Sequence, residues 1–166
     1  VSSNYAYVAN NGGNSVSVVD VSNPSGPTVV GTVNTDAGPY AIAVAGQYVY
    51  VVNSTASSLQ VIDVANPKAP FIKATLSTGS QPRGIAIMGN YAYISNTTSG
   101  DMQVIDIASP SNPSIKGTVP VGANPRAVAV QGRYAYVGVY GANTLRVVDV
   151  SSSTAPLAVG TVTTSN

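Results

Sequence analysis

Two arginines and a tyrosine recur at one position of the chain, with a spacing that would let them bind an anion together. Arg83 and Arg126 are 43 residues apart, Tyr40 lies 43 residues before Arg83, and each of the three follows a proline. Two neighbouring guanidinium groups can hold a carboxylate or a phosphate through paired hydrogen bonds. The alternative is that both side chains are solvated or donate hydrogen bonds to nearby loop carbonyls.

The composition excludes most enzyme chemistry. The 166 residues include no His, Cys, Trp or Glu, so Ser-His-Asp and Cys-His units and His- or Cys-ligated metals are ruled out. Asp36 and Asp101 are the carboxylates outside the repeat described below, and nothing pairs them as acid and base. No short stretch gathers the carboxylates that calcium needs. We expect no catalytic residue, no metal site and no cofactor.

Charge and hydropathy bear on the partners. Seven Lys and Arg residues against six Asp residues give a net charge of +1, so nothing favours a nucleic acid partner. The apolar runs are far shorter than the roughly 18 residues that span a bilayer, and we expect no membrane insertion. A chain rich in Ser, Thr, Asn and Gly but without Cys suits an extracellular or cell-surface protein, although some cytosolic proteins look alike.

A 43-residue repeat organises the whole chain. Ten of the eleven prolines follow the same step, and Pro120 is the exception. Aspartate and tyrosine follow it without gaps, at Asp20, Asp63, Asp106 and Asp149, at Tyr5, Tyr48, Tyr91 and Tyr134, and at Tyr7, Tyr50, Tyr93 and Tyr136. One structural unit is therefore repeated without insertions.

Each unit reads as four short strands. In the second unit they are expected at Tyr40–Ala45, Tyr48–Val52, Leu59–Val64 and Phe71–Leu76. Gly46-Gln47 suits a two-residue hairpin, because glycine accepts a positive φ. The recurring aspartate near the end of the third strand, Asp63 in this unit, should bond the turn that follows the strand.

The third strand is apolar on both faces, so its sheet must lie between two neighbours. Four-stranded units of this length with two such neighbours are blades of a β-propeller, and a β-solenoid is the main rival. We predict an all-β, single propeller segment over residues 1–166, with the paired tyrosines filling gaps between blades. Its blades are expected at residues 1–37, 38–80, 81–123 and 124–166.

Two segments carry a family resemblance. Tyr5–Asn10 with Val16–Pro24, and Tyr48–Asn53 with Leu59–Pro67, resemble the LVIVD repeat and the closely similar YVTN repeat. The resemblance implies a propeller typical of bacterial and archaeal surface and secreted proteins, including surface-layer proteins, and implies no enzyme activity. The fourth unit departs from it at Val139, where the others have Asn.

The ends of the chain fall within a unit. Residue 1 aligns with Val44 and residue 166 with Ala37, so the first blade should lack its innermost strand. An uncovered strand edge is a template for pairing. Three interpretations stay open: a segment of a longer repeat protein, pairing with a second copy into an eight-bladed ring, or a four-bladed ring with one incomplete blade.

The loops between the second and third strands vary most, and they lie on the face where the arginines are expected. They are rich in Asn, Ser, Thr and Gly and supply further binding candidates, Tyr140, Asn53 and Asn96. Loops on a rigid scaffold are common binding sites, for a protein or a glycan, but these can equally be solvated turns. Asn53 and Asn96 also begin N-glycosylation acceptor triplets.

These features favour a non-enzymatic extracellular or cell-surface scaffold. Its partner would be a protein, or a second copy of the chain, bound through the loops or the open blade edge. The alternative is a glycan- or anion-binding module. It would use Tyr40, Arg83 and Arg126, which we expect at one mouth of the central channel, together with the loops between the second and third strands.

Overall fold

The computed structural model describes residues 4–164 as four antiparallel sheets, one for each repeat. The first sheet contains β1 (Tyr5–Asn10), β2 (Ser15–Asp20) and β3 (Thr28–Asn34). The second contains β4 (Pro39–Ala45), β5 (Tyr48–Asn53), β6 (Ser58–Asp63) and β7 (Phe71–Ser77). The third contains β8 (Pro82–Met88), β9 (Tyr91–Asn96), β10 (Asp101–Asp106) and β11 (Ser114–Pro120). The fourth contains β12 (Pro125–Gln131), β13 (Tyr134–Val139), β14 (Thr144–Asp149) and β15 (Leu157–Thr163). Two short 3-10 turns, η1 (Asn11–Gly13) and η2 (Tyr140–Ala142), follow β1 and β13.

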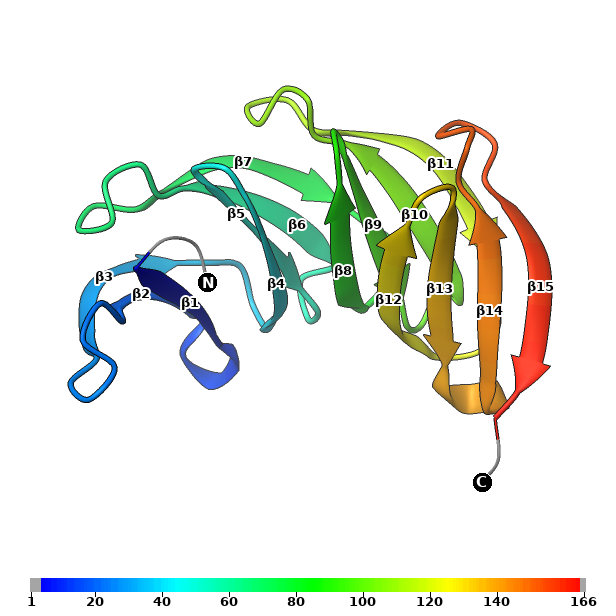
Figure 1. Ribbon diagram of the computed structural model, residues 1–166, viewed down its shortest axis with the longest axis horizontal. Helices are drawn as coiled ribbons and strands as arrows, with labels where there is room; N and C mark the ends of the chain where they lie inside the picture. The colour runs from blue at the N-terminus through cyan, green and yellow to red at the C-terminus, as the bar shows by residue number, and fades with distance from the viewer. Residues whose placement is uncertain (1–3, 165–166) are drawn as a thin grey trace.

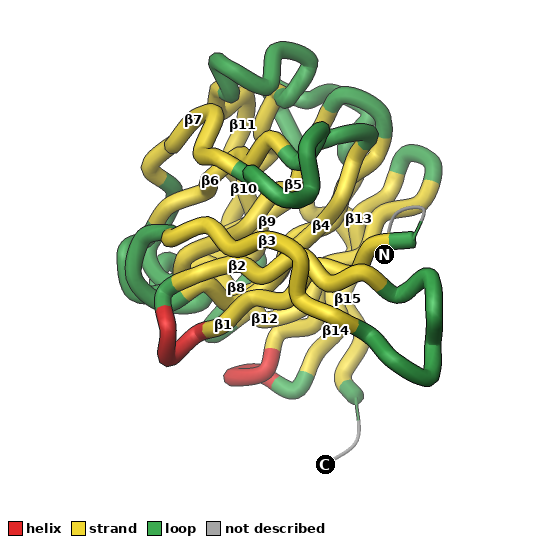
Figure 2. Tube along the Cα trace, turned by 90° about the vertical axis from the view of Figure 1, so that its left-hand side faces the viewer, coloured by secondary structure: helices red, strands yellow, loops and turns green. Residues whose placement is uncertain are grey.

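The fold is an all-β propeller of four blades, and within the described residues the first blade lacks its innermost strand. The blades stand side by side in an open arc, with β4, β8 and β12 along its concave side (Figure 1). Viewed from the first blade, η1 and η2 lie at the same end of the strands (Figure 2). In Figure 1 the first and fourth blades stand at opposite ends of the open arc, so these four blades do not close on one another. The interpretation as a closed four-bladed ring is therefore wrong. Residues 4–164 include no helix with the length and apolarity that crossing a membrane requires.

The first hairpin of each complete blade has the predicted tight turn. Gly46, Gly89 and Gly132 have φ values of +58, +57 and +57°. Each begins a two-residue loop, because the residue before the glycine pairs with the tyrosine that follows the loop. Glycine at the first loop position is the requirement of a type II′ turn, whose twist matches that of the strands.

Three apolar cores hold the four blades together, one at each junction. The core between the second and third blades joins Tyr50, Leu59 and Val61 of one sheet to Ile94 and Ile105 of the next. Analogous cores join the first blade to the second and the third to the fourth. Tyr50 and Tyr93 are both 2% exposed, which confirms that the tyrosines fill gaps between blades. Burial, with a smaller effect of the neighbouring phenol, raises the pKa of each.

The register aspartates close the turns that follow their strands, as predicted. Asp20, Asp63, Asp106 and Asp149 each accept a hydrogen bond from the backbone N–H two residues later, at 2.9–3.1 Å. Asp149 also accepts from the Arg133 guanidinium. Those bonds, chiefly the one from Arg133, lower the pKa of Asp149 to about 2.

This shift predicts how acid affects stability. An unfolded Asp has a pKa of about 3.9, so the ionised form of Asp149 stabilises the fold fully above about pH 4. Its contribution is lost as the pH falls through about 2. We expect Asp149→Asn to melt below the wild type at pH 7, with a gap in Tm that narrows between pH 4 and pH 2. Thermal melts by circular dichroism measure the gap, and a constant gap over that range would contradict the assignment.

Candidate functional site

β4, β8 and β12, the strands of the concave side, all begin at the strand ends where η1 and η2 lie. Gly38, Gln81 and Asn124, with φ of +73, +55 and +55°, turn the chain into the prolines that start β4, β8 and β12. Loops of the preceding blades hold two of these starts. Asn11 donates to the Pro39 carbonyl at 3.2 Å, and Thr97 donates to the Pro125 carbonyl at 2.8 Å. Tyr40 and Arg126, which follow these two prolines, therefore lie beside the loop of the preceding blade.

The structure brings the predicted arginines into contact with the predicted tyrosines. The guanidinium carbon of Arg83 lies 5.2 Å from the ring centre of Tyr40, on the preceding blade. That of Arg126 lies 3.8 Å from the ring of Tyr140, on its own blade. Both distances are typical of cation–π contacts. Among residues 4–164 neither arginine forms an ion pair, and Arg83 Nε is buried without a hydrogen-bond partner.

Asn53 and Asn96 are placed differently from the other candidates. Both are 0% exposed. The Asn53 amide donates to Ser58 Oγ and Gln60 Oε1, and the Asn96 amide donates to Asp101 Oδ1 at 2.7 Å. The two side chains thus tie the second strand of the blade to the third, beneath the loops. A direct contact of either residue with a ligand or a glycan stays a prediction.

Sequence reasoning missed a group that anchors the links between blades. Gln60 and Gln103 accept hydrogen bonds from the backbone N–H of Asp36 and Gly79, at 2.9 and 3.0 Å. Arg146, at the same repeat position, donates to the Val121 carbonyl at 3.2 Å. The signal that could have revealed them is a long polar residue at one register position of an otherwise apolar strand.

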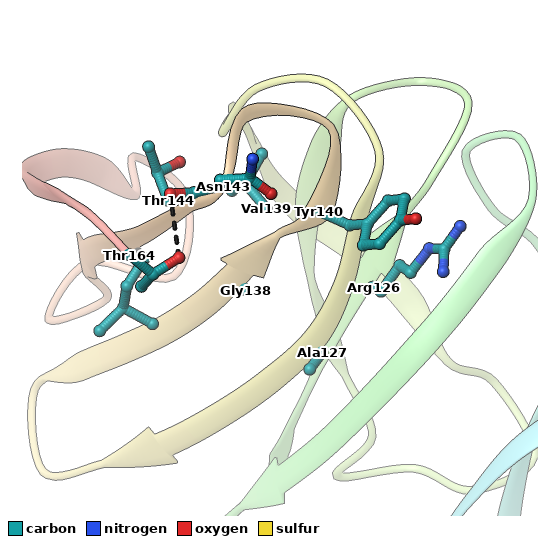
Figure 3. A pocket seen from close by; sticks show the side chains of 9 residues that line it. Arg126, Ala127, Gly138, Val139, Tyr140, Asn143, Thr144 and Thr164 are labelled. Carbon is teal, nitrogen blue, oxygen red and sulfur yellow. Dashed lines mark hydrogen bonds between the residues drawn. The ribbon is translucent and has the colours of Figure 1, made fainter. Parts of the chain in front are cut away.

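A groove of about 310 Å³ lies on the face of the fourth blade that is turned away from the third blade. Ala127, Gly138 and Leu145 are among the residues that line it. Arg126 lies beside Tyr140 at one end (Figure 3). At the other end Thr164 donates to the Asn143 carbonyl at 3.0 Å. The equivalent surface of the third blade is covered, because Gly84 faces the backbone of β12. The groove is therefore the uncovered half of a contact between blades.

One protein family matches nearly the whole chain. It is described as the LVIVD repeat, and it matches residues 1–35, 40–78, 80–121 and 123–164. Among curated proteins there is no match.

Solved structures share the fold at low identity. A protein from Lactobacillus plantarum is 16% identical, with a TM-score of 0.87 over 100% of this chain and 55% of its own. The periplasmic gluconolactonase PpgL of Pseudomonas aeruginosa is also 16% identical, with a TM-score of 0.84 over 97% and 51%. Hydrazine synthase of Kuenenia stuttgartiensis is 23% identical, with a TM-score of 0.74 over 94% and 46%. The chain thus spans about half the length of these structures.

Proposed function

Since this chain belongs to the LVIVD repeat family, we propose that it is a non-enzymatic scaffold, outside the cell or on its surface, for protein contact or self-assembly. In this role it is one arc of a larger assembly of repeats. The single observation behind the proposal is that, among residues 4–164, nothing packs on the apolar blade faces at the two ends of the arc, where Val8 and Val162 are exposed. Apolar surface of this kind on a rigid scaffold marks a site of protein association.

The first experiment tests the absence of catalysis. One similar structure is a gluconolactonase, so the purified chain is assayed with gluconolactone. We expect hydrolysis at the uncatalysed rate, and an equal rate for Arg83→Gln, because the chain offers no His or Glu as a base. Turnover above background that Arg83→Gln abolishes would overturn the proposal.

Surface biotinylation of intact cells that make the protein checks the proposed location, and labelling of the protein only after lysis would contradict that location.

A second candidate function is binding of a small anion at the arginine-tyrosine row, which consists of Tyr40, Arg83, Arg126 and Tyr140. The favouring observation is that Arg83 and Arg126 form no ion pair within the described residues, and that Arg83 Nε is buried without a partner. Such a guanidinium can bind a carboxylate or a phosphate. A carboxylated sugar would add ring stacking on Tyr40, which is exposed.

Calorimetry with gluconate and with inorganic phosphate tests this candidate. If the row is a site, Arg83→Lys should weaken binding about tenfold, because lysine keeps the charge but loses the paired hydrogen bonds. Lys68→Met is the matched control, since Lys68 is an exposed cation in a loop between β6 and β7. Equal binding by wild type and Arg83→Lys would eliminate the row as the site.

A further inference from the structure

The two ends of the arc are the two halves of one kind of interface. At each internal junction, one blade contributes its forward face, which is turned toward the next repeat, and the next blade contributes its backward face. The forward face of the fourth blade and the backward face of the first have no such neighbour in the described chain. The internal junctions therefore show which kind of blade face fits each end of the arc.

One pair of positions makes this clear. The pairs Val33 and Val51, Leu76 and Ile94, and Val119 and Val137 each pack in one core, with the first member from the forward face and the second from the backward face. At the ends the same positions are Val162 and Val8. Val162 is 55% exposed and Val8 is 44% exposed, whereas Val51, Ile94 and Val137 are 0% exposed.

The outermost strand offers a second match. A Cβ at Gly31 would lie 2.2 Å from the Pro67 carbonyl oxygen of the next blade, and one at Gly117 would lie 2.5 Å from the Ser153 carbonyl oxygen. These glycines therefore form slots for the loop that precedes the next blade's fourth strand. Gly160 has the same repeat position, but a Cβ there would meet only Val147 of its own blade, at 3.6 Å. The slot at Gly160 is open, and Pro24 of the first blade has the position of Pro67.

We propose that a second copy of this chain docks on these faces, so that two arcs close into one ring about a twofold axis. The fourth blade of each copy packs on the first blade of the other, with Val162 against Val8 and Gly160 against the Pro24 loop. The arc spans about half the length of similar solved structures, so two copies suffice to close a ring. Twofold symmetry then satisfies both junctions at once and leaves no end for further growth.

The first blade also determines what the junction leaves open. It has no innermost strand in the described residues, so no strand of residues 4–164 pairs with the inner edge of β1 in the ring. The groove beside Ala127 and Gly138, which such a strand covers at the internal junctions, opens toward the centre of the ring. Contact at the two new junctions is therefore made by the outer three strands.

The proposal rests on the scaffold function, which it makes specific by naming the partner. Sedimentation equilibrium of the purified chain over a range of concentrations tests it. We expect a mass of twice 16.7 kDa, which falls to that of a single chain in Val162→Lys and in Val8→Lys. A wild type that stays monomeric throughout, or that grows beyond two chains, would overturn the two-chain ring. Circular dichroism verifies that both variants keep the fold.

Val159→Lys is the matched control for the added charge. Val159 is also exposed, and the same repeat position carries Lys73 and Lys116, which the internal junctions accommodate. This variant should remain a dimer. If it dissociates, the added charge alone explains why Val162→Lys loses the dimer, and the assigned contact of Val162 with Val8 is overturned. A wild type that is monomeric contradicts the two-chain ring but leaves the scaffold function standing. Turnover of gluconolactone contradicts the scaffold function itself, so the two failures are distinguishable.

Discussion

Replacement of Tyr50 by alanine should lower the free energy of unfolding by about 3–5 kcal/mol, the usual loss for deleting a large buried aromatic side chain. Tyr50 is 2% exposed in the core between the second and third blades. Its removal leaves a cavity that neither sheet can fill, because the backbone of each is fixed by strand pairing. Urea denaturation followed by circular dichroism measures the loss.

Tyr136 provides the internal control, because it has the same repeat position on the forward face of the fourth blade. It is only partly buried there, so Tyr136→Ala should cost less than half as much. Both variants are best made in the Val162→Lys background, which keeps association out of the measurement. Equal losses at Tyr50 and Tyr136 would show that the core does not follow the junctions between blades.

Valine at Gly31 should be almost as damaging, with a loss of about 3 kcal/mol from overpacking. The added Cβ points at the Pro67 carbonyl oxygen, 2.2 Å away, and that atom belongs to backbone that cannot rotate aside. The second blade has alanine at this position, Ala74, so a single methyl group is tolerated at one junction and the branched side chain is the sharper test. Thermal and urea unfolding both report the loss.

Gly160→Val is the matched substitution at the end of the arc. A Cβ there meets nothing closer than Val147 at 3.6 Å, an ordinary van der Waals distance. In the Val162→Lys background this variant should therefore unfold within about 0.5 kcal/mol of its parent, as surface substitutions usually do. A loss like that of Gly31→Val would mean that the strand itself, and not the neighbouring blade, requires glycine.

Much of the blade could be predicted because its signals are local. The glycine turns, the alternating tyrosines and the aspartate-closed turns each depend on residues a few positions apart, and they appear where the repeat placed them. The first blade's missing strand followed from counting alone. Such features depend on chain geometry that one repeat already contains.

The shape of the arc and the burial of Asn53 and Asn96 could not be predicted in the same way. Curvature depends on the angle at which one sheet packs on the next, and the same blade pattern is compatible with rings of different size. The composition of the loop that begins at Asn53 indicates a binding surface or a solvated turn, and both interpretations place this side chain at the surface. It is buried instead, because Ser58 and Gln60 accept its amide hydrogens, and partners in space are not visible in a linear pattern.

The three junction cores have a consequence for how the molecule comes apart. Each blade exchanges stabilisation only with its immediate neighbours, as in a row of coupled units. The middle blades have two such couplings and the terminal blades have one, so an isolated arc should fray from its extremities inward. Amide hydrogens of β5 and β9 would then exchange with deuterium most slowly, and ring closure would erase that gradient by giving every blade a neighbour on both sides.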